Sequence, residues 1–391
     1  MKKLCLLIIV LSTLTGCWNY RELNQLAITT GIAIDKKEDK FIISLMIANS
    51  KKQNSSDNEA QASTAIYTGE GITFYEAIKD AALSVSKQVY LGHIEVLVIS
   101  EEIAKNDMIE ITDFLFRYPQ TRNQFYVIIA ENSDAKDVFE ITMPLESFPS
   151  QNISKNLEIT ERLQGYTYKV TFNQFISSIL TEGISPTLPT VQVIGNVEEG
   201  NKEENIKQNK PDTYLKLGMI ALFKDNKLVA ISNKEESSGI NIINNHVQTL
   251  GIQIECESGH IVSETTNSKA NIEVDLSKEI PKVIIDVDMN ASIQEVSCKI
   301  DLENNENIKL IKQKDEEKIK DYILSAIDLA KKNKTDIFGF GNKIYKKDFS
   351  YWYQIQDKWD DEIFPQIEVE INPKVTLTDK GSMNTIIEVN K

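Results

Sequence analysis

The chain has 391 residues, 41% hydrophobic and 26% charged, and its 58 acidic and 43 basic side chains give a net charge of −15. Such a composition is typical of a folded protein of about two or three domains, and the low content of Gly and Pro argues against a low-complexity chain. An acidic surface repels phosphate groups. We therefore expect no nucleic-acid partner and no basic patch that attaches the chain to anionic lipid.

The N-terminus has the pattern of a lipoprotein signal. Two lysines precede an apolar run over residues 4–11, which is too short to cross a bilayer. Its position behind two cations favours a secretory signal over a buried strand. The run leads to Leu14-Thr15-Gly16-Cys17, which resembles the bacterial lipobox. We predict a signal peptide at 1–16 and a lipid on Cys17; an ordinary signal that happens to precede a Cys is the alternative. Two or more acyl chains hold a protein stably on a membrane.

Residues 17–145 are predicted to form an α/β domain. A hairpin of β-branched strands is followed by alternating helices and strands, and a capping box from Thr73 to Glu76 starts the first helix. The order β-β-α-β-α-β favours a mixed sheet covered by helices. The expected strands are 26–34, 41–48, 94–99 and 125–130, the helices 74–87 and 107–117, the polar turn 35–39 and the solvated loop 50–63.

Residues 146–235 are predicted to form a small, mainly helical middle domain, because Pro144 and Pro149 interrupt the preceding pattern. A capping box from Thr171 to Gln174 begins its second helix. Residues 196–212 have almost no apolar side chains and are expected to be an exposed linker or long loop. The expected helices are 152–164 and 172–181, the strand 190–194, and the hairpin 215–223 with 227–231.

Residues 236–391 are predicted to form a largely antiparallel sheet with one long helix at 315–332. The expected strands are 250–256, 270–276, 282–294, 367–371, 375–377 and 385–389. The fold class is therefore α+β (mixed α/β) with three domains. These are an N-terminal mixed sheet with helices, a small helical middle part, and a C-terminal sheet with one long helix.

The residue types that usually carry chemistry form no recognisable constellation. His93, His246 and His260 have no partner at the spacing of metal ligands. The segments 84–87 and 56–58 match two motifs of penicillin-binding enzymes, but in the wrong order and without the third. We expect no catalytic residue, no metal and no cofactor.

Four other features receive mainly structural interpretations. Gly339-Phe340-Gly341 favours a turn over a nucleotide fingerprint. His93, just before a strand, is interpreted as an orienting or capping residue more than as a general base. The aromatic residues between 349 and 364 could form a carbohydrate or partner surface, but bracing of a loop against the last sheet is favoured. Cys256 and Cys298 could form a disulfide or remain two buried thiols, and the sequence does not decide.

Four stretches, in the same order, resemble the Ger(x)C spore germination lipoproteins. Asn19 and Gln120 replace residues that are acidic in the family pattern, and these departures are conservative. The stretches are GCWNYRELN at 16–24, YLGHIEVLVISEEIA at 90–104, FRYPQTR at 116–122, and DIFGFG at 336–341 with Trp352 and Trp359 downstream.

The resemblance implies a non-enzymatic C subunit of a nutrient germinant receptor. A lipid on Cys17 would place it on the outer face of the spore inner membrane, beside a polytopic A subunit and a transporter-like B subunit. Its implied role is that of a scaffold or signal-transfer component, acting by binding. The alternative is a solute-binding lipoprotein of a nutrient importer, although a largely antiparallel C-terminal half argues against it. A cell-envelope hydrolase is a third hypothesis, which lacks a recognisable nucleophile.

Overall fold

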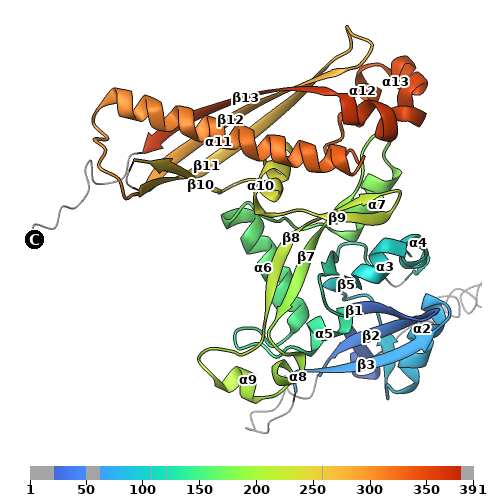
Figure 1. Ribbon diagram of the computed structural model, residues 1–391. Coiled ribbons are helices and arrows are strands. Elements are labelled where there is room, and N and C mark those ends of the chain that lie inside the picture. Colours follow the sequence, from blue (N-terminus) through green and yellow to red (C-terminus); the bar gives the residue numbers. More distant parts are fainter. Residues whose placement is uncertain (1–21, 50–61, 107, 120, 258, 380–391) are drawn as a thin grey trace, which may run out of the picture.

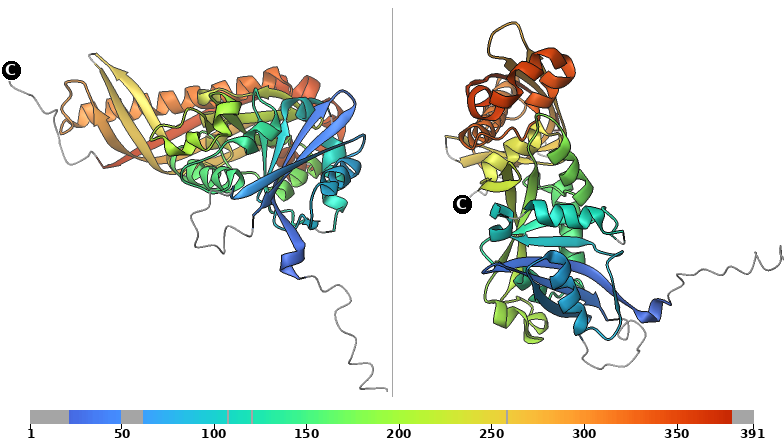
Figure 2. Two further views of the ribbon diagram at one scale, coloured as in Figure 1. Left: turned by 90° about the horizontal axis from the view of Figure 1, so that it is seen from below. Right: turned by 90° about the vertical axis from the view of Figure 1, so that its right-hand side faces the viewer.

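The computed structural model describes residues 22–49, 62–106, 108–119, 121–257 and 259–379. Figure 1 shows a lower body built on a nine-stranded sheet and an upper body built on a four-stranded sheet, which lies across one end of the lower body. Figure 2 shows the same elongated arrangement from two other sides. The predicted fold class is confirmed in its mixed N-terminal sheet, its second C-terminal sheet and its long helix. The predicted signal peptide, Cys17, segment 56–58 and strand 385–389 lie outside the described residues.

The first sheet is mixed. Its strand order is β3-β2-β1-β5-β6-β7-β8-β9, and the short β4 pairs with the start of β1. Parallel pairs occupy the centre, and antiparallel pairs flank them on both sides. The strands are β1 (Leu26–Lys37), β2 (Lys40–Ala48), β3 (Thr64–Gly71), β4 (Gln88–Tyr90), β5 (Val96–Ser100), β6 (Tyr126–Ala130), β7 (Thr187–Ile194), β8 (Tyr214–Lys224) and β9 (Lys227–Ile231).

Helices cover both faces of this sheet. Successive strand residues point to opposite faces, so Leu97 and Ile99 share a core with α2, α3 and α4, whereas Val96 and Val98 share one with α5 and α6. The helices of this body are η1 (Leu23–Gln25), α2 (Phe74–Leu83), α3 (Glu101–Asn106), α4 (Met108–Arg117), α5 (Ala135–Glu140), α6 (Pro149–Leu163), α7 (Phe172–Leu180), α8 (Val197–Gly200) and α9 (Glu204–Lys207).

The strands of the segment 146–235 continue the first sheet. The parallel contact that joins them to the N-terminal strands consists of two residue pairs, Ile129 with Thr190 and Ala130 with Val191. The division of the chain at residues 145 and 235 stays a prediction.

The second sheet has the order β10-β11-β12-β13, with two antiparallel pairs and a parallel pair between β12 and β13. A parallel pair needs a crossover, and α11 with the shorter helices after it provides one. The strands are β10 (Gly251–Cys256), β11 (Gly259–Asp275), β12 (Lys282–Val296) and β13 (Glu368–Asp379). The helices are α10 (Lys234–Ile243), α11 (Asn305–Lys332), α12 (Phe340–Lys347), α13 (Phe349–Ile355), η3 (Gln356–Lys358), η4 (Trp359–Ile363) and η5 (Phe364–Gln366).

Several predicted boundaries are wrong. The helix predicted at 74–87 ends at Leu83, and the helix predicted at 315–332 begins at Asn305. The strands predicted at 367–371 and 375–377 are one strand, and the strand predicted at 270–276 is the end of the much longer β11. The sequence did not indicate β3, α3, α5, α10, α12 or α13.

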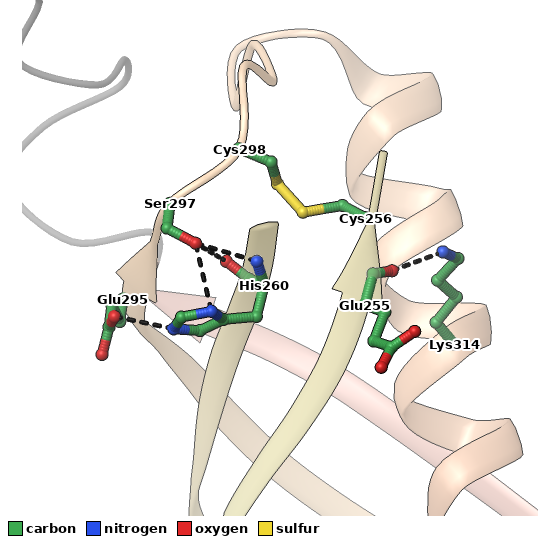
Figure 3. The surroundings of a disulfide bond; sticks show 7 residues. All are labelled: Glu255, Cys256, His260, Glu295, Ser297, Cys298 and Lys314. Atoms are coloured by element: carbon green, nitrogen blue, oxygen red, sulfur yellow. Dashed lines mark hydrogen bonds and ion pairs between the residues drawn. A yellow bond between two sulfur atoms is a disulfide. The ribbon is translucent and has the colours of Figure 1, made fainter. Parts of the chain in front are cut away.

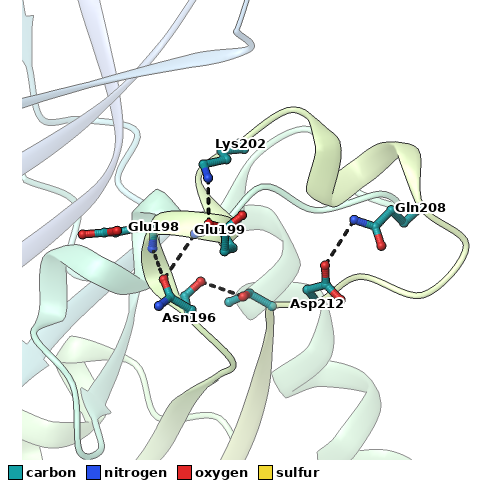
Figure 4. Close-up of polar contacts among 7 residues, drawn as sticks. Asn196, Glu198, Glu199, Lys202, Gln208 and Asp212 are labelled. Carbon is teal, nitrogen blue, oxygen red and sulfur yellow. Dashed lines mark hydrogen bonds and ion pairs between the residues drawn. The ribbon is translucent and has the colours of Figure 1, made fainter.

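The segment 196–212 is more ordered than the linker or loop expected from its composition. It is largely exposed, but it contains α8 and α9, and the polar contacts in Figure 4 hold its first turn. Asn196 Oδ1 accepts from the backbone N–H groups of Glu198 and Glu199, at 2.8 and 3.3 Å. The buried Asn205 donates to the carbonyl oxygens of Thr142 and Thr213. Polar side chains thus replace the missing apolar contacts.

Candidate functional site

A groove of about 990 Å³ lies between the start of β1, the turn before β5 and the first half of α6. Its walls combine apolar side chains, amides and a few charged groups. The lining residues are Leu23, Asn24, Leu26, Ile28, Thr30, Ala48, Lys87, Gly92, His93, Ile94, Glu95, Arg122, Gln124, Phe125, Tyr126, Phe148, Gln151 and Ser154.

Three of the four stretches that resemble the germination family meet in this groove. Leu23 and Asn24 come from the first stretch, residues 92–95 from the second, and Arg122 from the third. The sheet brings them together because β1 pairs in parallel with β4 and β5, and β5 with β6. The sequence marked these residues separately and gave no sign that they share a site.

The β1 wall of the groove offers an unused hydroxyl. Thr30 is only 7% exposed, and its Oγ1 has no hydrogen-bond partner within the described part of the chain. The register between β1 and β2 shifts between Thr29 and Gly31, an irregularity of the kind that redirects side chains. A buried hydroxyl without a partner costs about 1–3 kcal/mol, so Thr30 is a group that a ligand could satisfy.

The turn before β5 presents His93 at the rim. Gly92 precedes it, and a Cβ atom built there would lie 2.4 Å from the hydroxyl oxygen of Tyr90. A larger residue would therefore displace this ring, which contacts the His93 ring edge-on at 5.8 Å between centroids. His93 is exposed just before β5, and its interpretation as an orienting or capping residue stays a prediction.

Glu95 joins the strands at the base of the groove. Its N–H donates to the carbonyl of Thr30 at 2.9 Å, and its carbonyl accepts from the N–H of Tyr126 at 2.9 Å. Its carboxylate accepts from Ser150 Oγ at 3.0 Å. Burial raises the pKa of the Glu95 carboxyl, and the hydrogen bonds from Ser150 and Gln151 act in the opposite direction.

The start of α6 forms the opposite wall. Pro149 occupies the first turn, where a missing N–H costs nothing, and Phe148 before it is buried. The hydroxyl of Tyr126 donates to Glu158 on this helix at 2.9 Å. Burial, followed by the hydrogen bond to Glu158, raises the pKa of Tyr126 to about 12.

Two basic side chains lie at the rim in an otherwise acidic protein. Lys87 and Arg122 are exposed there beside the imidazole of His93, whereas Glu95 lies deeper. The groove thus combines an apolar floor, walls with amide side chains and a rim with basic side chains. This combination suits the binding of an amphipathic ligand that carries negative charge.

The fourth family-like stretch forms a different kind of site, around the fully buried Asp336. Its Oδ1 accepts from the N–H groups of Phe338 and Phe340, both at 3.2 Å. Its Oδ2 accepts from Gly341 N at 2.7 Å and Trp359 Nε1 at 3.1 Å. Burial raises the pKa of Asp336 to about 7, while these four donors favour its charged form.

The turn at Gly339 is confirmed. Gly339 has a φ of 69°, in the left-handed region that favours glycine, and the following Phe340 is completely buried. The site is therefore a closed, fully hydrogen-bonded corner of the upper body.

The aromatic cluster is only partly as expected. Trp352, Trp359 and Phe364 pack inside, but they belong to α13 and to short helical turns, not to a loop. Phe349 and Tyr353 on α13 are exposed.

The structure answers the open question about the cysteines, because Cys256 and Cys298 form a disulfide (Figure 3). The bond joins the end of β10 to the segment after β12. On the other side of β10, Lys314 Nζ of α11 donates to the carbonyl of Glu255 at 2.7 Å.

A Ser-His-Glu arrangement beside the disulfide was not expected. Ser297 Oγ lies 3.2 Å from His260 Nδ1, and His260 Nε2 lies 2.8 Å from Glu295 Oε1 (Figure 3). The Ser297 hydroxyl also donates to the carbonyl of His260 and accepts from its N–H. Because this hydroxyl is hydrogen-bonded to the backbone of β11, we interpret the cluster as a structural link between β11 and the end of β12 and not as a catalytic triad.

His246 lies at the junction of the two bodies. Its ring stacks on Tyr168 at 3.9 Å between centroids, and burial lowers its pKa to about 4. Its role is therefore that of a neutral, packed side chain.

Within the described ranges, no three His, Cys, Asp or Glu side chains are grouped so that they could hold a metal ion. In the same part of the chain, every helix is too short or too polar to cross a bilayer.

Two family models match the chain. The model of the spore germination protein N-terminal domain matches residues 19–193, and the model described as spore germination B3/GerAC like, C-terminal, matches residues 219–381. The two matches follow each other along most of the chain, and the gap between them falls inside the first sheet, between β7 and the second half of β8.

Curated relatives extend over nearly the full length. Spore germination protein KC of Bacillus subtilis (strain 168) is 25% identical, covering 98% of this chain and 96% of that protein. Spore germination protein B3 of the same organism is 23% identical, covering 97% and 98%. The crystal structure of the GerBC protein has a TM-score of 0.54 and 18% identity, covering 91% of this chain and 100% of that one, and so shows the same fold.

Proposed function

This chain belongs to the Ger(x)C family of spore germination proteins, and we propose that it is the lipid-anchored C subunit of a nutrient germinant receptor. The role in germination follows from the family. The anchor, the receptor assembly and the scaffold role are proposed here.

The proposed anchor is the lipid on Cys17, which lies outside the described residues. The lipobox-like sequence before it supports this assignment. An acidic body needs such an anchor, because its charge provides no attraction to anionic headgroups. We propose that it sits on the outer face of the spore inner membrane.

The observation that carries the proposal is the position of the groove relative to this anchor. The described chain begins at Glu22, and Leu23 and Asn24 already line the groove. An extended chain spans at most about 3.6 Å per residue, so Glu22 lies within about 18 Å of Cys17. A lipid at Cys17 would hold the groove next to the membrane surface.

We propose that the subunit works there by binding, as a scaffold or signal-transfer component beside the A and B subunits. The groove supports this role because its wall groups are arranged for contact with another molecule. The closed Asp336 corner, whose carboxylate is hydrogen-bonded within the fold, is assigned a structural role in the upper body.

The anchor is tested with spores that carry Cys17→Ala in the full chain. We expect the variant chain to fold, to lack acyl chains by mass spectrometry, and to slow germination in a mixture of amino acids, sugars and nucleosides. Cys5→Ala, inside the predicted signal peptide, is the matched control and should germinate normally. Normal germination by the Cys17→Ala spores would overturn the proposal.

A further inference from the structure

The groove contains hydrogen-bonding capacity that the fold itself does not use. Thr30 Oγ1 is buried without a partner among the described residues. The backbone of Leu26–Ile28 pairs with β4 as its single described strand neighbour, whereas Gly31–Ile34 of the same strand pair with both β2 and β5. One edge of this short strand segment therefore has no strand partner in the described chain.

We propose that this groove binds an extended peptide segment of a membrane-spanning partner, with apolar side chains and at least one acidic side chain. The inference rests on the proposed function, which places the groove at the membrane, and it names the chemistry of the partner.

The walls favour a peptide over a lipid. Asn24, Gln124 and Gln151 line the groove together with the hydroxyl of Thr30. Amide side chains offer both donors and acceptors, which a peptide backbone can match and an acyl chain would leave desolvated without partners. A strand edge binds an extended segment through main-chain hydrogen bonds, while apolar floor residues such as Leu26 and Ile28 accept its alternate side chains.

The rim and the anchor define the partner further. Arg122 would meet an acidic side chain, and a charge-assisted hydrogen bond to Arg is stronger than a neutral one. Since Glu22 lies within about 18 Å of the lipid-bearing residue, the bound segment must lie close to a membrane span.

Photo-crosslinking in spore membranes tests the proposal with the full chain. A photoreactive residue replaces Gln151 in the groove, and the control position is Ile159, which is exposed on the same helix but outside the groove. We expect Gln151 alone to capture an identified peptide with apolar and acidic residues next to a membrane span. Capture of lipid only, of a second copy of this chain, of the same products at both positions, or of nothing would each overturn the proposal.

Two substitutions make the test quantitative. Arg122→Glu should lower the crosslink yield from Gln151 about tenfold, and an acid-to-Lys change in the captured segment should restore it. Lys216→Glu, an equal charge change at an exposed residue of β8 outside the groove, should leave the yield unchanged. An equal loss for both variants, or no loss for Arg122→Glu, would contradict the proposal.

The experiment separates this inference from the proposed function. Suppose that Cys17→Ala spores show a germination defect, while Arg122→Glu spores crosslink and germinate normally. This result would support the anchored subunit and contradict the peptide-binding groove. Normal germination in Cys17→Ala spores would contradict the proposed role of the lipid anchor.

Discussion

The groove in the lower body and the Asp336 corner in the upper body are both built from family-like stretches, but they use polar groups in opposite ways. Asp336 is completely buried, and four N–H donors satisfy its carboxylate. In the groove, the buried Thr30 hydroxyl is left without a partner in the described chain, and Arg122 stays exposed at the rim.

This difference shows that motif residues can serve the fold in one place and recognition in another. A satisfied polar group stabilises its own surroundings, and its removal should cost stability. An unsatisfied polar group does not stabilise the free protein, so its removal should weaken binding of a partner and should not lower stability. The following substitutions test whether the two sites obey this distinction.

The largest effect is expected for Asp336→Ala. The change leaves three backbone N–H groups and Trp359 Nε1 buried without an acceptor, which should lower the free energy of unfolding by about 3–5 kcal/mol. Chemical denaturation of the full chain measures it. Asp361→Ala, which removes exposed ion pairs to Lys224 and Lys334, is the control and should have a much smaller effect. Equal losses would mean that the corner does not stabilise the upper body.

A second buried carboxylate in the upper body, Asp315, has a similarly raised pKa but lacks the four N–H donors of Asp336. Asp315 on α11 is buried, no hydrogen bond of good geometry reaches either of its oxygens within the described residues, and burial raises its pKa to about 7 although the nearby Ser263 hydroxyl lowers it. The folded state therefore holds a proton that the unfolded state releases near pH 4, so stability falls as the pH rises from about 4 to about 7.

Asp315→Asn should remove this loss and raise the free energy of unfolding by on the order of 3 kcal/mol at pH 7.5, with little gain at pH 4. Thermal unfolding across this pH range measures the effect. Asp321→Asn, on the exposed side of the same helix, is the matched control. A gain that is the same at both pH values would show that ionisation is not the cause.

The smallest effects come from a pair of threonines. Thr335 is buried beside Asp336 and donates to the carbonyl of Phe223, so Thr335→Val should cost about 1–2 kcal/mol. Thr30→Val in the groove removes a buried hydroxyl without a described partner, so it should cost no stability and should raise the free energy of unfolding by about 1 kcal/mol. Denaturation curves of the two variants give the comparison directly. A clear loss for Thr30→Val would place its hydroxyl in the fold and not in recognition.

Local signals in the sequence predicted many of the elements. Thr171 and Gln174 form the expected capping box of α7, and Thr73 caps α2 as expected. In the predicted box at Thr73, however, Glu76 accepts from the N–H of Ile72 and not from that of the N-cap residue Thr73.

The missed elements depend on contacts between distant segments. β3 contains Gly69 and Gly71, which look like strand breakers in the sequence, but in the structure the backbone of α2 lies directly against them. β13 runs parallel to β12 because α11 crosses between them, and no residue pattern within β13 carries that direction.

The candidate site also depends on contacts between distant segments. The resemblance marked His93, Glu95 and Arg122, but their meeting depends on the order of β1, β5 and β6. Phe148 and Thr30 carried no signal at all, because an unsatisfied hydroxyl is visible only when its neighbours are known.

The position of the disulfide also determines an order of assembly. Cys256 and Cys298 both precede α11, so a chain that emerges from its N-terminus can close the bond before the residues of β13 exist. The link encloses β11 and β12, which pair as neighbours in the sequence, whereas β13 must wait for the whole crossover. Pairing between segments far apart in the chain is slow to form. We therefore expect the covalent bond to hold the antiparallel strands β11 and β12 together early in folding, and the parallel edge strand β13 to dock last.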